Sequence, residues 1–181
     1  MFCLLTFSNA SAQMGNFFPS DRFSSSLIAD LCQDKYGYIW IATDYGLNRY
    51  DGYHFETFLH NDESPTSICN SVVVSLLLDR DGRLWVGTNR GLDRYDESID
   101  GFVHYPFPNG VLPRVSSMLQ LPDGQILVAT SGYGAFLVSE DGQPKPTEDY
   151  ADKDNNQYFG EVYLDSHGRF WKSGYDNTVV M

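Results

Sequence analysis

The chain is poor in basic residues, in cysteine and in long apolar runs. Lysine and arginine together number 12 against 24 aspartates and glutamates, so the net charge is −12. Binding to nucleic acid or to an anionic membrane surface requires a basic patch, and this composition argues against both partners. Because no run of about 18 apolar residues is present, we expect no insertion of this segment into a membrane.

Known catalytic and cofactor motifs are also missing from the sequence. It contains no G-x-S-x-G motif, no Ser/His/Asp set, no P-loop and no dinucleotide-binding glycine pattern. The histidines lack the spacing of metal ligands, and we expect solvent-facing positions for those in strands and turns. They are His54, His60, His104 and His167. We therefore expect no enzyme activity, no metal and no cofactor in this chain.

Aromatic residues and glycine, in contrast, are plentiful. Aromatic side chains make up 15% of the chain and there are 16 glycines. This combination is typical of many short strands joined by tight turns. No segment has the pattern of a helix.

One cassette recurs along the chain at a nearly fixed spacing. Asp34–Tyr50 reads D-K-Y-G-Y-I-W-I-A-T-D-Y-G-L-N-R-Y, and Asp79–Tyr95 reads D-R-D-G-R-L-W-V-G-T-N-R-G-L-D-R-Y, 45 residues later. A weaker third copy and a partial fourth copy follow. Their landmarks are Gly124, Leu127, Thr130 and Gly134 in the third, and Asp165 and Trp171 in the fourth. A repeat of this length indicates one supersecondary unit stacked on copies of itself.

Each complete unit contains four predicted strands. In unit one they are 27–33, 38–43, 47–50 and 54–59, and in unit two 72–78, 84–88, 92–95 and 102–105. Unit three lacks the tryptophan, and we interpret 142–156 after it as a charged loop containing proline. The pattern predicts an all-β fold, a partial β-propeller of about three and a half four-stranded antiparallel blades. The predicted propeller spans 13–181, with blades at about 27–59, 72–105, 115–138 and 159–181.

The number of repeats bears on how the ring closes. Leu27 to Met181 holds about 3.5 periods, whereas propellers close with roughly four to eight blades. We expect the chain to be the N-terminal part of a larger ring. A strained closure with four blades is the less favoured alternative.

The first residues have features of an export signal. Phe2–Phe7 is apolar, and Ala10-Ser11-Ala12 fits the small-x-small rule for cleavage, so we interpret 1–12 as a signal remnant and expect an exported protein. The alternative is that this stretch is not a signal, because a positively charged start is missing. Removal of Cys3 would leave Cys32 and Cys69, which we expect to be buried as small apolar residues rather than paired.

The repeated tryptophans and aspartates have structural and functional interpretations. Trp40, Trp85 and Trp171 lie in apolar strands, which favours packing between blades over stacking on a sugar. The aspartates each lie in a turn that ends in glycine, which favours turn formation over calcium binding or catalysis. They are Asp34, Asp79, Asp81, Asp123 and Asp165.

The loop between the second and third strands differs in sequence from unit to unit, whereas the residues on either side of it recur. Between the second and third strands the four units present Tyr45, Arg90, Tyr133 and Tyr175, and in a propeller these loops gather at one face around the axis. Variable side chains on a rigid scaffold are where binding usually resides. Tyrosine faces and a guanidinium suit a sugar or an acidic glycan, so we predict a ligand site here. Ordinary exposed loop residues remain the alternative.

The pattern D-x-x-G-x-(I/L)-W-(I/V)-(A/G)-T-x-x-G-L-(N/D)-R-Y-D closely resembles the two-component regulator propeller repeat. Units one and two match nearly throughout, and unit four matches only in D-x-x-G-x-x-W. The resemblance implies the periplasmic sensor region of a hybrid two-component histidine kinase, which recognises a ligand, often carbohydrate. It also implies further blades, a kinase in a longer chain and signalling through a homodimer.

Two other functions stay open. A propeller glycosidase or lyase would need two carboxylates near the axis. Asp30 and Glu161 lie on inner strands, but we do not expect them to meet in one register, since Ser75 and Ser117 lie between them. The third possibility is a non-catalytic scaffold for protein interactions.

Overall fold

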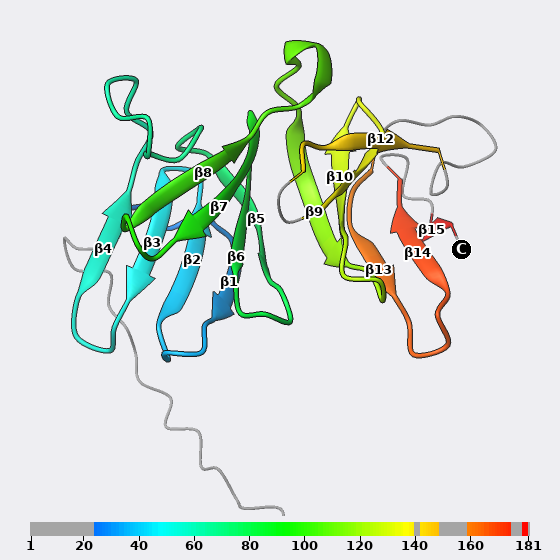
Figure 1. The fold of residues 1–181 in the computed structure, drawn as a ribbon. Coiled ribbons are helices and arrows are strands. Elements are labelled where there is room, and N and C mark those ends of the chain that lie inside the picture. The colour runs from blue at the N-terminus through cyan, green and yellow to red at the C-terminus, as the bar shows by residue number, and fades with distance from the viewer. Residues whose placement is uncertain (1–23, 140–141, 149–158, 175–178, 181) are drawn as a thin grey trace, which may run out of the picture.

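The computed structural model describes residues 24–139, 142–148, 159–174 and 179–180. These residues form 15 strands in four antiparallel sheets, with a single 3-10 helix at Pro108–Gly110 between the second and third sheets. No helix in this described part of the chain has the length and hydrophobicity needed to cross a membrane. The protein is therefore all-β, a partial propeller of about three and a half blades, as the repeat predicts (Figure 1).

The first two blades are four-stranded meanders in which each strand pairs with the next. Blade 1 consists of β1 (Ile28–Gln33), β2 (Ile39–Thr43), β3 (Gly46–Tyr50) and β4 (Phe55–Phe58). Blade 2 consists of β5 (Val73–Leu78), β6 (Leu84–Thr88), β7 (Gly91–Asp96) and β8 (Gly101–Tyr105). These bounds differ by about one residue from the predicted ones, because the alternation of apolar residues and the turn glycines act locally.

Blades 3 and 4 follow the same order. Blade 3 consists of β9 (Arg114–Gln120), β10 (Ile126–Ser131), β11 (Ala135–Val138) and β12 (Lys145–Thr147), and blade 4 of β13 (Val162–Leu164), β14 (Phe170–Ser173) and β15 (Val179–Val180). The prediction of a loop over 142–156 is wrong at β12, which pairs with β11 and sets Pro146 opposite Phe136. An outermost strand tolerates proline because one side of its backbone needs no partner. The proposed signal at 1–12 lies outside the described residues.

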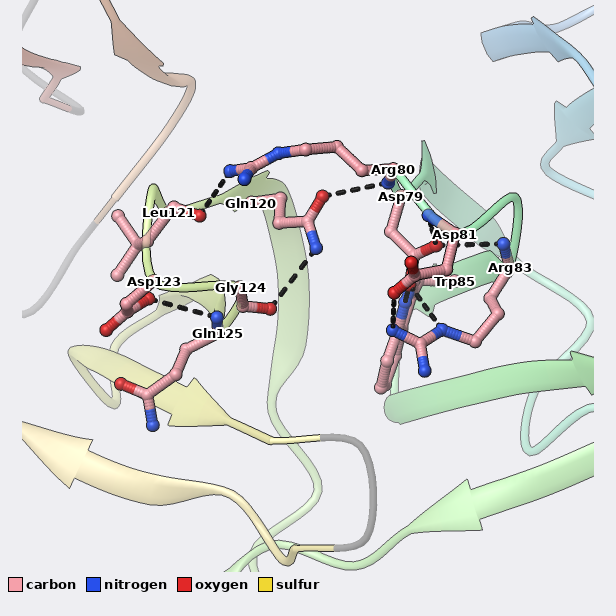
Figure 2. Close-up of polar contacts among 10 residues, drawn as sticks. All are labelled: Asp79, Arg80, Asp81, Arg83, Trp85, Gln120, Leu121, Asp123, Gly124 and Gln125. Atoms are coloured by element: carbon pink, nitrogen blue, oxygen red, sulfur yellow. Dashed lines mark hydrogen bonds and ion pairs between the residues drawn. The ribbon is translucent and has the colours of Figure 1, made fainter.

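The turn between the first and second strands is held by a carboxylate. In blade 2 the Asp79 carboxylate accepts backbone hydrogen bonds from Asp81 and Arg83 and a bond of 2.9 Å from the indole nitrogen of Trp85 (Figure 2). In blade 1 the indole nitrogen of Trp40 likewise donates to the Asp34 carboxylate at 2.8 Å. In blade 4 the indole nitrogen of Trp171 donates to the Asp165 carboxylate at 3.0 Å. The aspartates at these turns are structural, which confirms the turn interpretation.

The cores lie between adjacent blades. Trp40 and Trp85 are each 1% exposed, the first within the core shared by blades 1 and 2 and the second within the core shared by blades 2 and 3. Burying a ring of this size contributes several kcal/mol, at about 25 cal/mol per Å² of apolar area. Packing between blades, predicted for these two tryptophans, is confirmed. Trp171 is half-buried.

Blade 1 exposes apolar surface on the face that points away from blade 2, where Leu31 is 62% exposed. Leu76 occupies the equivalent repeat position in blade 2, and it packs against the core that blade 1 shares with blade 2. This repeat position is therefore covered in blade 2 and exposed in blade 1, because blade 2 has blade 1 on that side whereas none of blades 2 to 4 packs there on blade 1 in the described part of the chain.

Both cysteines in the described part of the chain are unpaired. Cys32 and Cys69 are partly buried rather than fully buried. Burial raises the pKa of the Cys32 thiol to about 12, with the nearby Asp30 and Asp34 carboxylates adding to the effect. Burial likewise raises the pKa of Cys69. Both side chains are neutral thiols at physiological pH, so neither is a good nucleophile.

Candidate functional site

A threonine closes the turn between the second and third strands in blades 1 and 2. The buried Thr43 hydroxyl donates to the carbonyl of Gly46 at 2.8 Å and accepts from the backbone N–H of Tyr45 at 3.1 Å. In blade 2, Thr88 makes the same pair of bonds with Gly91 and Arg90, at 3.0 and 3.1 Å. The sequence T-x-x-G is thus a rigid clasp that satisfies the turn's polar groups.

Glycine is required at the end of this clasp. Gly46 has a φ of 112°, and a Cβ there would come within 2.8 Å of Leu59 and 2.9 Å of the carbonyl oxygen of Phe58. Any other residue would be strained and would clash. The residue just before the glycine is held in place by its bonded N–H, while its side chain is free to vary.

The predicted site residues occupy this position before the glycine in three blades. Tyr45 is 59% exposed, Tyr133 is 48% exposed, and Arg90 is exposed as well. They precede Gly46, Gly134 and Gly91, so the repeat places them at the same end of their blades. Tyr175, the fourth predicted residue, lies outside the described residues.

Arg90 lies beside a cavity that sequence reasoning missed. The cavity has a volume of about 360 Å³, and its other walls come from the linker 60–69 and from the segment 104–112. Neither Tyr45 nor Tyr133 is among its walls. Both segments lie outside the repeated cassette, which is why no periodic signal in the sequence marks this cavity.

A buried carboxylate ties the linker to blade 2 next to this cavity. Asp93 is fully buried; one of its oxygens accepts a bond of 2.7 Å from the backbone N–H of Cys69, and the other lies 2.6 Å from Nδ1 of His104. The hydrogen bond with Asp93 raises the pKa of His104 against the opposing effect of burial, with help from the Pro65 carbonyl. His104 is exposed, as expected, although it also bonds to Asp93, and the side chain of His54 is 80% exposed.

A second, smaller cavity of about 220 Å³ lies where the innermost strands meet. Asp30, Ser75, Ser117 and Glu161 all line it, so the expectation that the two carboxylates do not share a register is wrong. Each of the four residues stands seven positions before a turn glycine, which brings them to one level of the fold. The β1, β5 and β9 strands also have a register irregularity next to this level, which helps to aim the side chains inward.

Most polar groups around this axial cavity already hold the blades together. The Asp30 carboxylate accepts backbone bonds of 2.8 Å from Leu31 and from Leu76 of the next blade. Ser117 accepts a bond of 3.3 Å from the backbone of Val162 in blade 4. A carboxylate with both oxygens engaged in this way is a link between strands rather than an available base.

Two stretches of the chain, residues 22–45 and 67–90, match the model of the family described as two component regulator propeller. Blades 1 and 2 each contain a two-component regulator propeller repeat. The stretches cover the first two strands of blades 1 and 2, with the turn between them and the clasp threonine, and they end just before Gly46 and Gly91.

Among curated proteins, histidine kinase P4 of Formosa agariphila is 41% identical over 60 residues, which is 33% of this chain and 4% of that kinase. Among solved structures, the extracellular domain of a B. thetaiotaomicron protein described as a hybrid two component system is similar, with a TM-score of 0.68 and 19% identity. That match covers 85% of this chain and 24% of the other, so this chain spans about a quarter of the length of that domain.

Propellers of other functions also share the fold. Virginiamycin B lyase of Staphylococcus aureus has a TM-score of 0.62 and 15% identity, over 84% of this chain and 54% of the lyase. At this level of identity the likeness concerns the fold alone. The two-component propeller repeats, in contrast, are supported by residue patterns as well as by shape.

Proposed function

We propose that this chain is the propeller part of an exported sensor in a hybrid two-component system and that it recognises a carbohydrate. The ligand-binding residues in this proposal are Tyr45, Arg90, Tyr133 and Tyr175. The support comes from the repeats and from the relatives, of which one is a histidine kinase and another an extracellular domain.

The observation that carries the proposal is the contrast within each clasp. Thr43 and Thr88 are buried and fully bonded, whereas the residues between them and the glycines are exposed and differ from blade to blade. A rigid frame lowers the entropy cost of binding because the side chains are already positioned. Tyrosine rings and a guanidinium supply the flat apolar faces and fixed donors that sugars require.

Signal transmission belongs to the same proposal. The face of blade 1 that points away from blade 2, with Leu31 exposed, suits a further blade of the same type, since blade 2 uses the equivalent Leu76 against blade 1. Further blades and a kinase in a longer chain would complete the sensor. Ligand binding would then bias packing between propellers in a homodimer.

Binding is tested by calorimetric titration of the protein, or of a longer chain that contains it, with a panel of oligosaccharides. We expect binding without turnover, and at least a tenfold loss of affinity when Tyr45→Ala, Arg90→Ala and Tyr133→Ala are combined. The matched control is Tyr53→Ala, which removes another exposed tyrosine. Unchanged affinity in the triple variant would show that the site is elsewhere, and no binding to any sugar would favour a protein-interaction scaffold.

A propeller lyase or glycosidase is the second candidate, favoured by the axial cavity that contains both Asp30 and Glu161. The bonds that Asp30 already makes to two backbone N–H groups weigh against it. Incubation of the same oligosaccharides followed by analysis of the products decides between the two functions. Cleavage that is lost in Glu161→Gln would support the enzyme and contradict the sensor.

A further inference from the structure

The cavity beside Arg90, which we call the Arg90 cavity, has a charge pattern unlike that of the whole chain. The chain as a whole carries a net charge of −12. The ionisable residues lining the Arg90 cavity are Arg90, His60, His104, Cys69, Tyr105 and Asp62. Asp62 is thus the one acid among them, and it lies 3.0 Å from Nε2 of His60. Asp93 is buried and does not line the cavity, and its carboxylate is bonded to His104 and to the backbone of Cys69. An anion in the cavity therefore has one carboxylate, that of Asp62, among the lining residues.

Arg90 has no partner for its guanidinium among the described residues. Each of the other arginines in those residues has one: carboxylates for Arg49, Arg83 and Arg169, carbonyls for Arg80, an amide for Arg114 and a ring for Arg94. A guanidinium presents a planar fork of donors that matches a carboxylate or a sulfate. Among the described arginines, Arg90 is thus the one whose guanidinium donors remain available to a ligand.

The linker that lines the Arg90 cavity is preformed. Its linker satisfies its own polar groups: the backbone of Asn61 donates to Ser67 at 3.0 Å, and Ser67 in turn donates to the carbonyl of Ser64. The backbone N–H of Phe102 then fixes this linker to blade 2 through the carbonyl of Thr66 at 2.8 Å. A cavity with fixed walls is typical of a ligand site.

The third wall is apolar and partly exposed. Leu112 and Val111 line the Arg90 cavity, and Leu112 is 54% exposed. Phe107 and Leu92 also line the cavity and are buried. Apolar side chains and a guanidinium in the lining of one cavity fit a ring with one apolar face and one anionic substituent.

We propose that the Arg90 cavity binds the acidic substituent of a glycan, a carboxylate or a sulfate, on Arg90, with the sugar ring against Val111 and Leu112. This inference rests on the proposed carbohydrate function and names the class of sugar. A carboxylate and a sulfate share the oxyanion that the guanidinium recognises, and the choice of probes separates the two.

The test is calorimetric titration with three tetrasaccharides of equal length: a galacturonic acid oligomer, a sulfated galactose oligomer and the unsubstituted galactose oligomer. We expect an acidic oligomer to bind at least tenfold more tightly than the neutral one. Arg90→Gln should abolish that preference, and Arg90→Lys should restore part of it because the charge returns without the fork. The acidic oligomer that binds more tightly identifies carboxylate or sulfate.

Two controls isolate the charge at the cavity. Lys145→Gln removes one positive charge from an exposed position on β12 and should leave the preference for the acidic oligomer intact. Leu112→Asp should weaken binding of the acidic oligomer at least fivefold relative to Leu112→Asn, since only the first places an anion beside Arg90. Circular dichroism confirms that the variants are folded.

The outcomes separate this inference from the proposed function. Equal affinity for acidic and neutral oligomers, or an unchanged preference in Arg90→Gln, would overturn the acidic site and leave carbohydrate sensing standing. Failure of all three oligomers to bind would contradict both.

Discussion

In blade 2 the turn between β5 and β6 is held by the Asp79 carboxylate, which also binds Trp85. In blade 3 the equivalent turn between β9 and β10 has only weaker side-chain bonds of its own, from the backbone of Gln125 to Asp123 and from Gln120 to the carbonyl of Gly124 (Figure 2). The two positions that carry Asp79 and Trp85 in blade 2 carry Leu121 and Leu127 in blade 3. Both leucines are buried in one core cluster. The polar pair has been replaced by an apolar pair.

The backbone of the turn is the same in both blades. Gly82 donates to the carbonyl of Asp79 at 2.9 Å, and Gly124 donates to the carbonyl of Leu121 at 3.0 Å. The turn geometry therefore depends on the glycine, and the side-chain pair stabilises what the backbone already forms. A buried indole N–H without an acceptor costs about 1–3 kcal/mol, so the aspartate and the tryptophan are expected to change together.

The largest effect should come from removing the ring. Trp85→Ala should lower the free energy of unfolding by about 4 kcal/mol, because a buried ring leaves a cavity between blades 2 and 3. Leu127→Ala in blade 3 should cost somewhat less, about 3 kcal/mol, since fewer atoms are removed. Urea denaturation followed by far-UV circular dichroism measures both. A loss below about 1 kcal/mol for Trp85→Ala would contradict the packing role.

The second-largest loss of stability should come from removing the Asp79 carboxylate. Asp79→Leu leaves the indole of Trp85 and two backbone N–H groups without their acceptor, and should cost about 2–3 kcal/mol in the same denaturation experiment. Combined with Trp85→Leu, which recreates the blade 3 pair, it should cost about 1–2 kcal/mol less than the sum of the single changes. Asp123→Ala is the control, since Asp123 accepts only the backbone bond from Gln125. Strict additivity would show that the pair is not a unit.

A smaller loss of stability should come from removing the bonds by which Arg80 links the turns of blades 2 and 3. Arg80 donates through its side chain to the carbonyls of Leu121 and Pro122, and its backbone N–H donates to the Gln120 side chain at 2.8 Å (Figure 2). Arg80→Ala removes only the side-chain bonds at an exposed site and should cost less than about 1 kcal/mol. Lys35, its counterpart in blade 1, forms an exposed ion pair with Glu97, so Lys35→Ala should have a similarly small effect. A loss of several kcal/mol for Arg80→Ala would mean that this bridge holds the blades together.

The smallest expected effect is a local response to acid. Burial acts to raise the pKa of Asp165, but bonds from Arg169, Trp171 and His167 outweigh it and lower the pKa to about 2. Burial also acts to raise the pKa of Asp79. Bonds from Trp85 and Arg83 outweigh it, so the pKa of Asp79 is lowered as well. Because the folded-state pKa values are depressed, the stabilisation is complete above about pH 4 and is lost as the pH falls through them.

Blade 3 should lack this response at the position equivalent to Asp79 and Asp165, since Leu121 stands there and does not titrate. Heteronuclear NMR of the indole N–H signals should show the Trp171 signal moving with a midpoint near pH 2, and Asp165→Asn should remove that movement. A midpoint at or above the usual aspartate value would contradict the bonded geometry.

Much of the fold follows from local sequence. Gly37, Gly82, Gly124 and Gly168 all have positive φ, and their spacing locates the turns without any tertiary information. The tryptophan strands could be predicted because both of their faces are apolar. The third blade was harder to delimit, since β12 has little apolar character and exists only through its pairing with β11.

The candidate site was only partly predictable. Tyr45, Arg90 and Tyr133 could be named because they vary within a constant frame, but no sequence pattern relates Arg90 to the linker 60–69 or to Leu112. The same holds for His104 and Asp93, whose contact depends on the pairing of β7 with β8 and on the path of the linker. Asp30 and Glu161 each stand the same number of residues before a turn glycine. This equal spacing in the sequence could have predicted that both side chains lie at the same height in the fold.

The sequence by itself determined the repeating unit: the glycine turns, the threonine clasps, the strand order and the pairing of aspartate with tryptophan. These features depend on contacts within a few residues, which local conformation and hydrogen bonding dictate. Only the tertiary structure decided which side chains share a cavity, because Arg90 and Leu112, or Asp30 and Glu161, meet through the stacking of separate blades and through linkers that no repeat encodes.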